Sequence, residues 1–338
     1  MLALVAASSL PAQGTAPVIT RKLTIGCESC GGATQFGSIQ DVSISVRGEI
    51  LVTDRDAPIL RRFDANGNPA WSGGRKGKGP GEFTLPIRSV FTPTGLLVID
   101  MSNSRLTDLG AEGRVIATLP LTSLATTSSA NKRGDVIMGL DDLGRSFRVM
   151  ARPAGATTLR EVARLPGSMK NKSVALAGDG RIAVVADGET YEIQRYDAAG
   201  TPMTPIARDI PRPRRSAVEE AEYRQRLNRG MAMMSAEMKK QGGDGRIAPL
   251  DIPPDQRGLE SHVTVDGLRY DDAGRLWVQT MRGDETGTVF DVFSPSGDFL
   301  GPVTIPMRIN GFALGGEWLV VAGENEDGVP VVTVWLVR

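Results

Sequence analysis

The chain has 338 residues, of which 41% are hydrophobic and 5% aromatic, and it contains 40 glycines. This length is large for one domain, although a closed ring of repeated β units reaches it without dividing. Basic and acidic residues number 39 each, so overall charge does not favour a nucleic acid or an anionic membrane surface as partner. No stretch approaches the ~20 apolar residues of a membrane-spanning helix. We therefore expect a globular protein with no nucleic-acid partner and no transmembrane span of its own.

The first 17 residues, MLALVAASSLPAQGTAP, have the pattern of a secretory signal. An apolar run is followed by Ser, Pro, Ala and Gln, as in an h-region and its cleavage region, although the basic n-region is missing. Either a few basic residues belong upstream of Met1, or the segment has another role. We expect an exported protein, located in the periplasm or outside the cell.

Two cysteines follow the predicted strand 18–25 (VITRKLTI). Cys27 and Cys30 stand in GCESCGG, and a C-x-x-C pair can be a redox dithiol, half of a zinc site or a structural disulfide. Zinc needs two further ligands, but the chain has no other cysteine and only one histidine, His262. A redox pair usually opens a helix, whereas this pair precedes two glycines and then β repeats. We predict a local Cys27–Cys30 disulfide, no metal and no cofactor.

A short phrase, a turn ending in glycine followed by an apolar strand, recurs six times along the chain. The turn glycines are 47, 39, 46, 94 and 42 residues apart, so one interval is double: Gly48, Gly95, Gly134, Gly180, Gly274 and Gly316. In most units a second turn glycine follows about 20 residues later, at Gly67, Gly113, Gly155, Gly200 and Gly297. Two hairpins per unit make four strands, and a period of about 40–50 residues is that of a β-propeller blade.

The sequence therefore predicts an all-β fold, a six-bladed β-propeller with four-stranded antiparallel blades. We place the blades at about 41–73, 87–119, 126–165, 172–207, 263–305 and 309–337. The last unit has only three predicted strands, which would leave an open edge in the ring. We predict that residues 18–25 supply the missing strand and close the ring; the alternative is a loose N-terminal arm.

One unit, residues 73–113, resembles an NHL repeat. Its glycine-rich segment has Gly77, Gly79, Gly81, Phe83 and Pro86, and its strands have Asp100, Asn103, Arg105 and Leu106 where the family has matching residues. Blade one keeps Asp54 but has Ile59 where the family has arginine, and the other blades keep only the rhythm of turns and strands. The resemblance implies a six-bladed NHL-like propeller and leaves the activity open, because a fold does not dictate chemistry.

The resemblance also implies two enzyme classes as candidate functions. Some NHL-like propellers are lyases with a zinc site of several histidines, which the single His262 excludes here. Others are lactonases with a metal held by Glu, Asn and Asp. Suitable oxygen ligands stand near predicted strand ends, at Asp54, Asp100, Asp187, Asn310 and Glu324, although such residues are ordinary turn formers there. We favour the interpretation that these residues form turns and do not bind a metal.

The double interval contains an insertion, residues 208–260, between blades four and five. Ser216 with Glu219 forms a capping-box pattern that begins a helix, and two lysines and two glycines end it. An apolar stripe recurs at helical spacing along it: Tyr223, Leu227, Met231, Met234 and Met238. Residues 211–240 carry eight basic and four acidic side chains, a local net charge of +4.

Two functional classes follow. We favour a non-catalytic binding or scaffold protein that holds a protein partner, for example as an extrinsic periplasmic subunit of a membrane complex. The stripe would form the apolar contact and Arg212, Arg214 and Arg215 a flanking basic patch, while the loop with Arg75, Lys76 and Lys78 is a secondary contact. The stripe could instead pack on the propeller itself. The alternative function is a metal-dependent, lactonase-like hydrolase or lyase acting on a small molecule in the central funnel.

Overall fold

The computed structural model describes most of the chain. It covers residues 14–56, 59–121, 123–131, 133–141, 145–166, 172–185, 188–240, 244, 258–283 and 286–338, without the side chains of residues 124, 233, 234 and 237–240. Residues 1–13 of the segment that resembles a secretory signal lie outside the described residues. Everything below concerns the described part of the chain.

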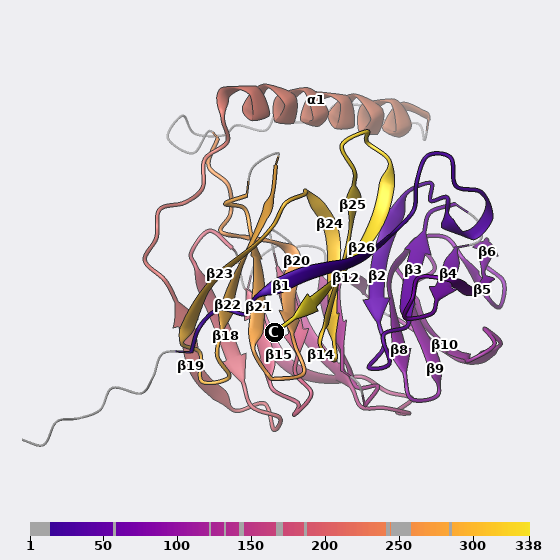
Figure 1. The fold of residues 1–338 in the computed structure, drawn as a ribbon, viewed down its shortest axis with the longest axis horizontal. Helices are drawn as coiled ribbons and strands as arrows, with labels where there is room; N and C mark the ends of the chain where they lie inside the picture. The colour runs from indigo at the N-terminus through magenta and orange to yellow at the C-terminus, as the bar shows by residue number, and fades with distance from the viewer. Residues whose placement is uncertain are drawn as a thin grey trace, which may run out of the picture.

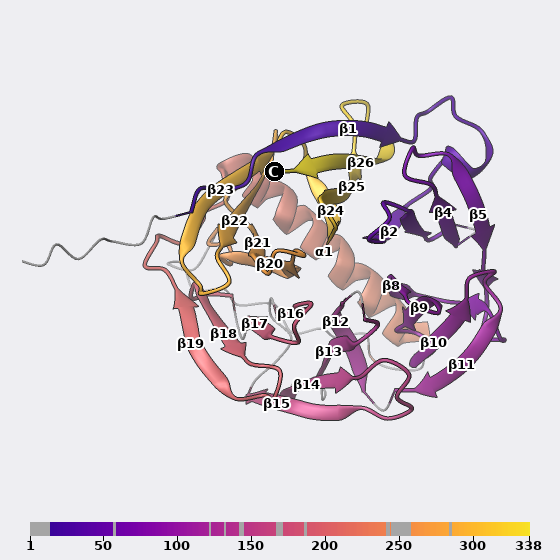
Figure 2. The same cartoon turned by 60° about the horizontal axis from the view of Figure 1, so that its bottom comes forward.

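Six antiparallel sheets of four strands each stand around a central axis (Figure 2). From the axis outward, the first blade is β2 (Ile39–Ile44), β3 (Ile50–Asp54), β4 (Leu60–Phe63) and β5 (Pro69–Gly73). The second is β8 (Pro86–Thr92), β9 (Gly95–Asp100), β10 (Arg105–Gly110) and β11 (Val115–Pro120). The third is β12 (Leu124–Ala130), β13 (Val136–Asp141), β14 (Ser146–Arg152) and β15 (Arg160–Pro166).

The remaining blades continue the ring in chain order. The fourth is β16 (Ser173–Leu176), β17 (Ile182–Val185), β18 (Glu192–Tyr196) and β19 (Pro202–Ala207). The fifth is β20 (Val263–Tyr270), β21 (Leu276–Thr280), β22 (Thr288–Phe293) and β23 (Phe299–Ile305). The sixth is β24 (Ile309–Gly315), β25 (Trp318–Glu324), β26 (Pro330–Val337) and β1 (Ile19–Ile25). The six-bladed propeller predicted from the repeat is confirmed.

The N-terminal strand closes the ring, as predicted. β1 lies antiparallel along β26, with Ile19 opposite Val337 and Ile25 opposite Val332 (Figure 1). Two backbone hydrogen bonds between Val18 and Arg338, of 2.8 and 2.9 Å, extend the pairing to the last residue. The first and last strands of the chain thus form one blade, which leaves no blade with a missing strand.

The glycine turns have a steric reason. Gly95, the turn glycine of the second blade, has φ 149°, and a Cβ there would lie 2.1 Å from the carbonyl oxygen of Leu109 on the neighbouring strand. Only glycine allows so close a backbone approach. Strands β3, β9, β13 and β17, second from the axis, have buried residues at nearly every position, whereas the outer strands β5 and β11 expose many of theirs. The hydrophobic core therefore lies between neighbouring blades.

A helix, α1 (Ala217–Lys240), lies across one mouth of the ring (Figures 1 and 2). Its capping box forms, because the Glu219 amide donates to Ser216 Oγ (3.2 Å) and the Ser216 amide to Glu219 Oε2 (2.8 Å). Two backbone hydrogen bonds join the segment before α1 to the segment that returns to the propeller. The Arg215 amide donates to the carbonyl oxygen of Gly258, and the Glu260 amide to that of Pro213, both at 2.8 Å. No helix in the described residues is long and apolar enough to cross a membrane.

Candidate functional site

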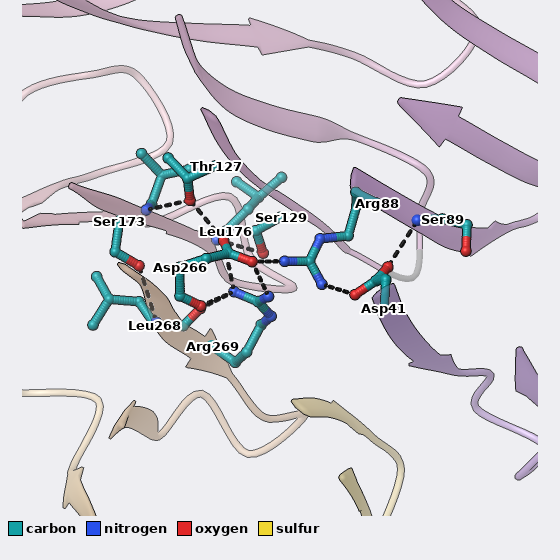
Figure 3. Close-up of polar contacts among 11 residues, drawn as sticks. Asp41, Arg88, Ser89, Thr127, Ser129, Ser173, Leu176, Asp266, Leu268 and Arg269 are labelled. Carbon is teal, nitrogen blue, oxygen red and sulfur yellow. Dashed lines mark hydrogen bonds and ion pairs between the residues drawn. The ribbon is translucent and has the colours of Figure 1, made fainter. Parts of the chain in front are cut away.

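Charged side chains from three blades meet at the propeller axis (Figure 3). Arg88 of β8 forms ion pairs with Asp41 of β2 and Asp266 of β20. Asp266 also accepts from Arg269 Nη2 at 2.8 Å. Both guanidinium groups point toward Asp266, as Figure 3 shows. We call these four residues the axial cluster.

A bulge in β20 places Asp266 in this position. The pairing of β20 with β21 shifts register between Val263 and Leu268, and Asp266 has φ 58°. A bulge of this kind redirects a side chain out of the regular strand pattern. Asp266 Oδ1 accepts a hydrogen bond from Thr127 Oγ1 of the third blade at 2.6 Å. Residue 266 thereby connects the fifth blade with the second and third.

Burial controls the electrostatics of the axial cluster. The side chains of Asp41 and Arg88 are 3% and 6% exposed, and that of Arg269 is 9% exposed. Burial raises the pKa of Asp41 against the opposing effect of Arg88. Burial also lowers the pKa of Arg269 to about 10, and burial together with the neighbouring Arg269 lowers that of Arg88 to about 10. The two carboxylates and two guanidinium groups balance one another and join blades one, two and five.

A cleft of about 560 Å³ separates α1 from the mouth that it crosses. The helix lines the cleft with Glu219, Glu222, Tyr223 and Arg226, which share one face at spacings of three and four. The propeller lines it with residues near the starts of β20 and β24 and the ends of β21 and β25, including Thr264, Met281, Ile309 and Asn310. The helix therefore covers the mouth and leaves space beneath it.

One member of the predicted apolar stripe, Tyr223, lines this cleft. Tyr223, Leu227 and Met231 are half-buried, while Gln225 and Asn228 on the outer side are exposed. The side chains of Met234 and Met238 lie outside the described residues. None of the six hydrophobic core clusters of the described residues includes a residue of α1. The described part of the stripe is thus half-buried and is not packed into the propeller core.

The predicted basic patch has partners within the chain. Arg215 forms ion pairs with Glu220 (2.8 Å) and Glu260, and its guanidinium lies 4.0 Å from the centre of the Tyr223 ring. Arg212 donates to the carbonyl oxygen of Glu260 at 3.0 Å. Arg214 forms an isolated β-bridge with Leu259. These arginines hold the two arms of the insertion together at the base of α1.

The predicted loop contact, Arg75, Lys76 and Lys78, is exposed. β6 (Arg75–Lys76) pairs in parallel with β7 (Glu82–Phe83), and Arg75 forms an ion pair with Glu82 at 2.7 Å. The motif residues that resemble an NHL repeat support this loop. Arg105 donates to the carbonyl oxygens of Lys78 and Gly79 at 2.9 and 3.0 Å, and Asp100 accepts from the amides of Thr84 and Leu85, both at 2.9 Å.

The candidate metal ligands do not meet at one site. Asp54 accepts from the amides of Gly37 and Ser38 at 3.0 and 2.9 Å, so it organises a turn much as Asp100 does. Asn310 and Glu324 line the cleft under α1, and Asp187 lies outside the described residues. Within the described ranges no three His, Cys, Asp or Glu side chains are grouped closely enough to hold a metal ion. Cys27 and Cys30 form a disulfide.

Sequence reasoning missed both the axial cluster and a second buried group near the base of α1. Asp291 is fully buried and accepts from Tyr191 Oη (2.7 Å), Arg208 Nη1 (2.6 Å) and Arg282. The His262 ring lies 5.7 Å from that of Tyr191, and its buried Nδ1 has no hydrogen-bond partner. The signal for the axial cluster was a charged residue inside an innermost strand, as in QDVSI, PIRSV and VDGLRY.

The fold is found in several solved structures. No protein-family model and no curated protein matches the sequence. A member of the DUF4221 family from Bacteroides vulgatus is similar at a TM-score of 0.56 and 10% identity, over 96% of this chain and 99% of that one. A putative exported protein from Bacteroides fragilis gives 0.55 and 11%, over 95% of both chains. A gluconolactonase from Xanthomonas campestris gives 0.53 and 11%, over 90% and 87%. At these identities the likeness shows the fold alone.

Proposed function

We propose that this protein is a non-catalytic binding protein of the cell envelope, which uses the mouth covered by α1 to hold a protein partner. The partner inserts a segment into the cleft between α1 and the propeller. There it meets the apolar stripe of Tyr223, Leu227, Met231, Met234 and Met238. An extrinsic periplasmic subunit of a membrane complex is the kind of protein that fits this role.

The observation that carries the proposal is the state of the stripe. Ordering a helix of 24 residues costs conformational entropy that contacts must offset. Tyr223, Leu227 and Met231 are only half-buried, and α1 contributes nothing to the core clusters of the described residues. A partner that fills the cleft would bury these side chains, and methionine adapts well to the shape of a partner.

The arginines have a positioning role in this proposal. Arg212, Arg214 and Arg215 tie the arms of the insertion together and hold α1 over the mouth. The contacts of Arg212 and Arg215 with Glu260 are intramolecular, so the partner meets a helix that is already placed. A placed helix lowers the ordering cost of binding. The basic side chains that line the cleft, and that a partner segment would reach, are Arg214, Arg215, Arg226 and Arg308.

Three observations support a location in the periplasm or outside the cell. The first 17 residues have an apolar run and a small-residue region like those of a secretory signal. Cys27 and Cys30 form a disulfide, and disulfides persist in oxidising compartments. One protein of similar fold is described as a putative exported protein. Descent from NHL-repeat propellers belongs to the same proposal and rests on the match at residues 73–113.

The test is affinity purification of the tagged protein from the native cell envelope after mild cross-linking. The variant Leu227→Ala/Met231→Ala removes two stripe side chains, while Gln225→Ala/Asn228→Ala changes the exposed side of the same helix. We expect the stripe variant to bind its copurifying partner about 1–2 kcal/mol more weakly, with an unchanged melting temperature. The outer-side variant should bind like the wild type.

Two results would overturn the proposal. If the stripe variant melts several degrees lower and keeps its partner, the stripe serves the propeller itself. If the purified protein hydrolyses a lactone when Ca²⁺ is added, the protein is an enzyme. Ca²⁺ is the appropriate addition because oxygen ligands such as those of Asn310 and Glu324 suit it.

A further inference from the structure

A second cavity, of about 480 Å³, lies at the mouth opposite α1. Its walls come from the far ends of the innermost strands, including Ile44 of β2, Thr92 of β8, Leu176 of β16 and Gly315 of β24. The cleft under α1 is lined near the opposite ends of such strands, for example by Ile309 at the start of β24. The two cavities are therefore separate, and this one is of the size of a small-molecule site.

Two buried arginines of the axial cluster, Arg88 and Arg269, line this cavity. Arg88 is 5% exposed, and its Nε–H is buried without an acceptor in the protein. Arg62, which also lines the cavity, has a buried Nε without a hydrogen bond, 3.9 Å from the nearest Glu49 oxygen. A buried donor without an acceptor costs free energy that an incoming acceptor would recover.

More arginines than carboxylates line the cavity: Arg47, Arg62, Arg88 and Arg269 against Glu49, Asp271 and Asp272. Two of the four, Arg88 and Arg269, are paired with Asp41 and Asp266 of the axial cluster. Asp271 is already bound to Arg275 (2.6 Å) and to the Trp277 indole (3.0 Å), and Asp272 accepts from the Gly316 amide (2.9 Å). Burial holds the pKa of Arg88 and of Arg269 at about 10, which means that both guanidinium groups would gain from additional negative charge.

The other residues that line the cavity indicate the chemistry of the rest of the ligand. Val90, Leu176 and Ala313 supply apolar surface, while Ser43, Thr92 and Asn131 supply polar groups. Sites for small molecules likewise combine apolar surface with placed polar groups. A short aliphatic or hydroxylated body attached to an acid would match both kinds of surface.

We propose that this cavity binds a small molecule bearing an oxyanion, a carboxylate or a phosphate, which accepts hydrogen bonds from Arg62 and Arg88 where they line it. The site lies at the other end of the channel from α1 and does not depend on the proposed protein partner. The oxyanion of the ligand points toward the axial cluster, and the rest of the ligand lies toward the mouth.

The test is isothermal titration calorimetry of the whole protein with three probes: succinate, its neutral diamide succinamide, and inorganic phosphate. Arg62→Gln removes the partly exposed guanidinium without touching the axial cluster, and Ala130→Phe fills the cavity. Arg226→Gln, in the cleft under α1, is the matched control. Circular dichroism melts establish that each variant is folded.

We expect saturable binding of succinate, phosphate or both, and none of succinamide. Because a hydrogen bond to a charged group contributes about 1.5–3 kcal/mol, Arg62→Gln should weaken binding by roughly 10-fold or more, Ala130→Phe should abolish it, and Arg226→Gln should leave it unchanged. Tighter binding of succinate than of phosphate would show that the cavity prefers a carboxylate, and the reverse order would show that it prefers a phosphate. Absence of saturable heat with both anions, equal binding of succinamide, or binding retained in both cavity variants would overturn the proposal.

Discussion

Single residues at the axis hold blades together across the ring. Asp266 is the most connected of them, because it receives Arg88, Arg269 and Thr127, residues that come from three different blades. The sequence separation between Thr127 and Asp266 is 139 residues. A contact of that range stabilises the ring only after the intervening blades have formed.

Replacing Asp266 by asparagine should destabilise the protein substantially. Arg88 and Arg269 would then share only the negative charge of Asp41. Breaking a buried ion pair costs about 3–5 kcal/mol, and because Asp266 is 26% exposed we expect about 2–4 kcal/mol in urea denaturation. Asp327→Asn, at an exposed turn of the sixth blade, is the control and should change stability by less than about 0.5 kcal/mol. Equal effects of the two substitutions would contradict this role of Asp266.

The only histidine should make stability depend on pH. Burial lowers the pKa of His262 below its ordinary 6.5, and Arg212 and Arg282 lower it further. The unfolded chain therefore takes up a proton before the folded protein does as pH falls. Stability is complete above pH 6.5, declines as pH falls below it, and levels off below the folded-state pKa.

The measurement is the unfolding free energy of the wild type and of His262→Gln at several pH values between about 5 and 8. The wild type should lose more stability than the variant on acidification. Because the chain has one histidine, the difference between the two curves reports His262 alone. Parallel curves would show that the histidine titrates alike in the folded and unfolded chains.

β1 and α1, like the small sheet of β6 and β7, do not follow the regular order of the blades along the chain. β1 completes the sixth blade by pairing with β26, and its Ile25 is buried in a core cluster with β2 and β25 residues. α1 is held at its base by the arms of the insertion and covers one mouth. One element therefore stabilises the ring, and the other lies outside its core.

Removing β1 should open the ring. A chain beginning at residue 26 exposes the edge of β26, and an exposed edge strand pairs with other chains. We expect a markedly lower melting temperature and self-association in size-exclusion chromatography. A chain beginning at residue 18 keeps β1 and serves as the control, which should remain monodisperse. If the two chains melt alike, β1 does not close the ring in solution.

On the scale of the whole molecule, the propeller is a ring whose two mouths differ. One mouth is covered by α1 above a cleft of about 560 Å³, and the other opens into a cavity of about 480 Å³ whose lining includes Arg88 and Arg269. The axial cluster lies at the propeller axis, and its Arg88 and Arg269 line the second of these cavities. The two proposals therefore concern different mouths of the ring, and each can fail without the other.

The architecture of the ring could be predicted from patterns in the sequence. Turn glycines such as Gly95, the repeat near 45 residues, the unpaired strand before Cys27 and the capping box at Ser216 are local signals. Each reflects the conformation of a few neighbouring residues, so each can be read without the fold. They were sufficient to predict six blades, ring closure by the N-terminal strand and one inserted helix.

Which residues meet at the axis and beneath the helix could be seen only in the folded protein. Asp41, Arg88 and Asp266 stand in three different blades, and a charged residue inside each innermost strand does not reveal that the three side chains meet. Likewise, helical spacing placed Tyr223 on one face of the helix without revealing that this side chain lines a cleft. Such contacts depend on how closed blades are arranged around the axis, and local sequence patterns carry no information about that arrangement.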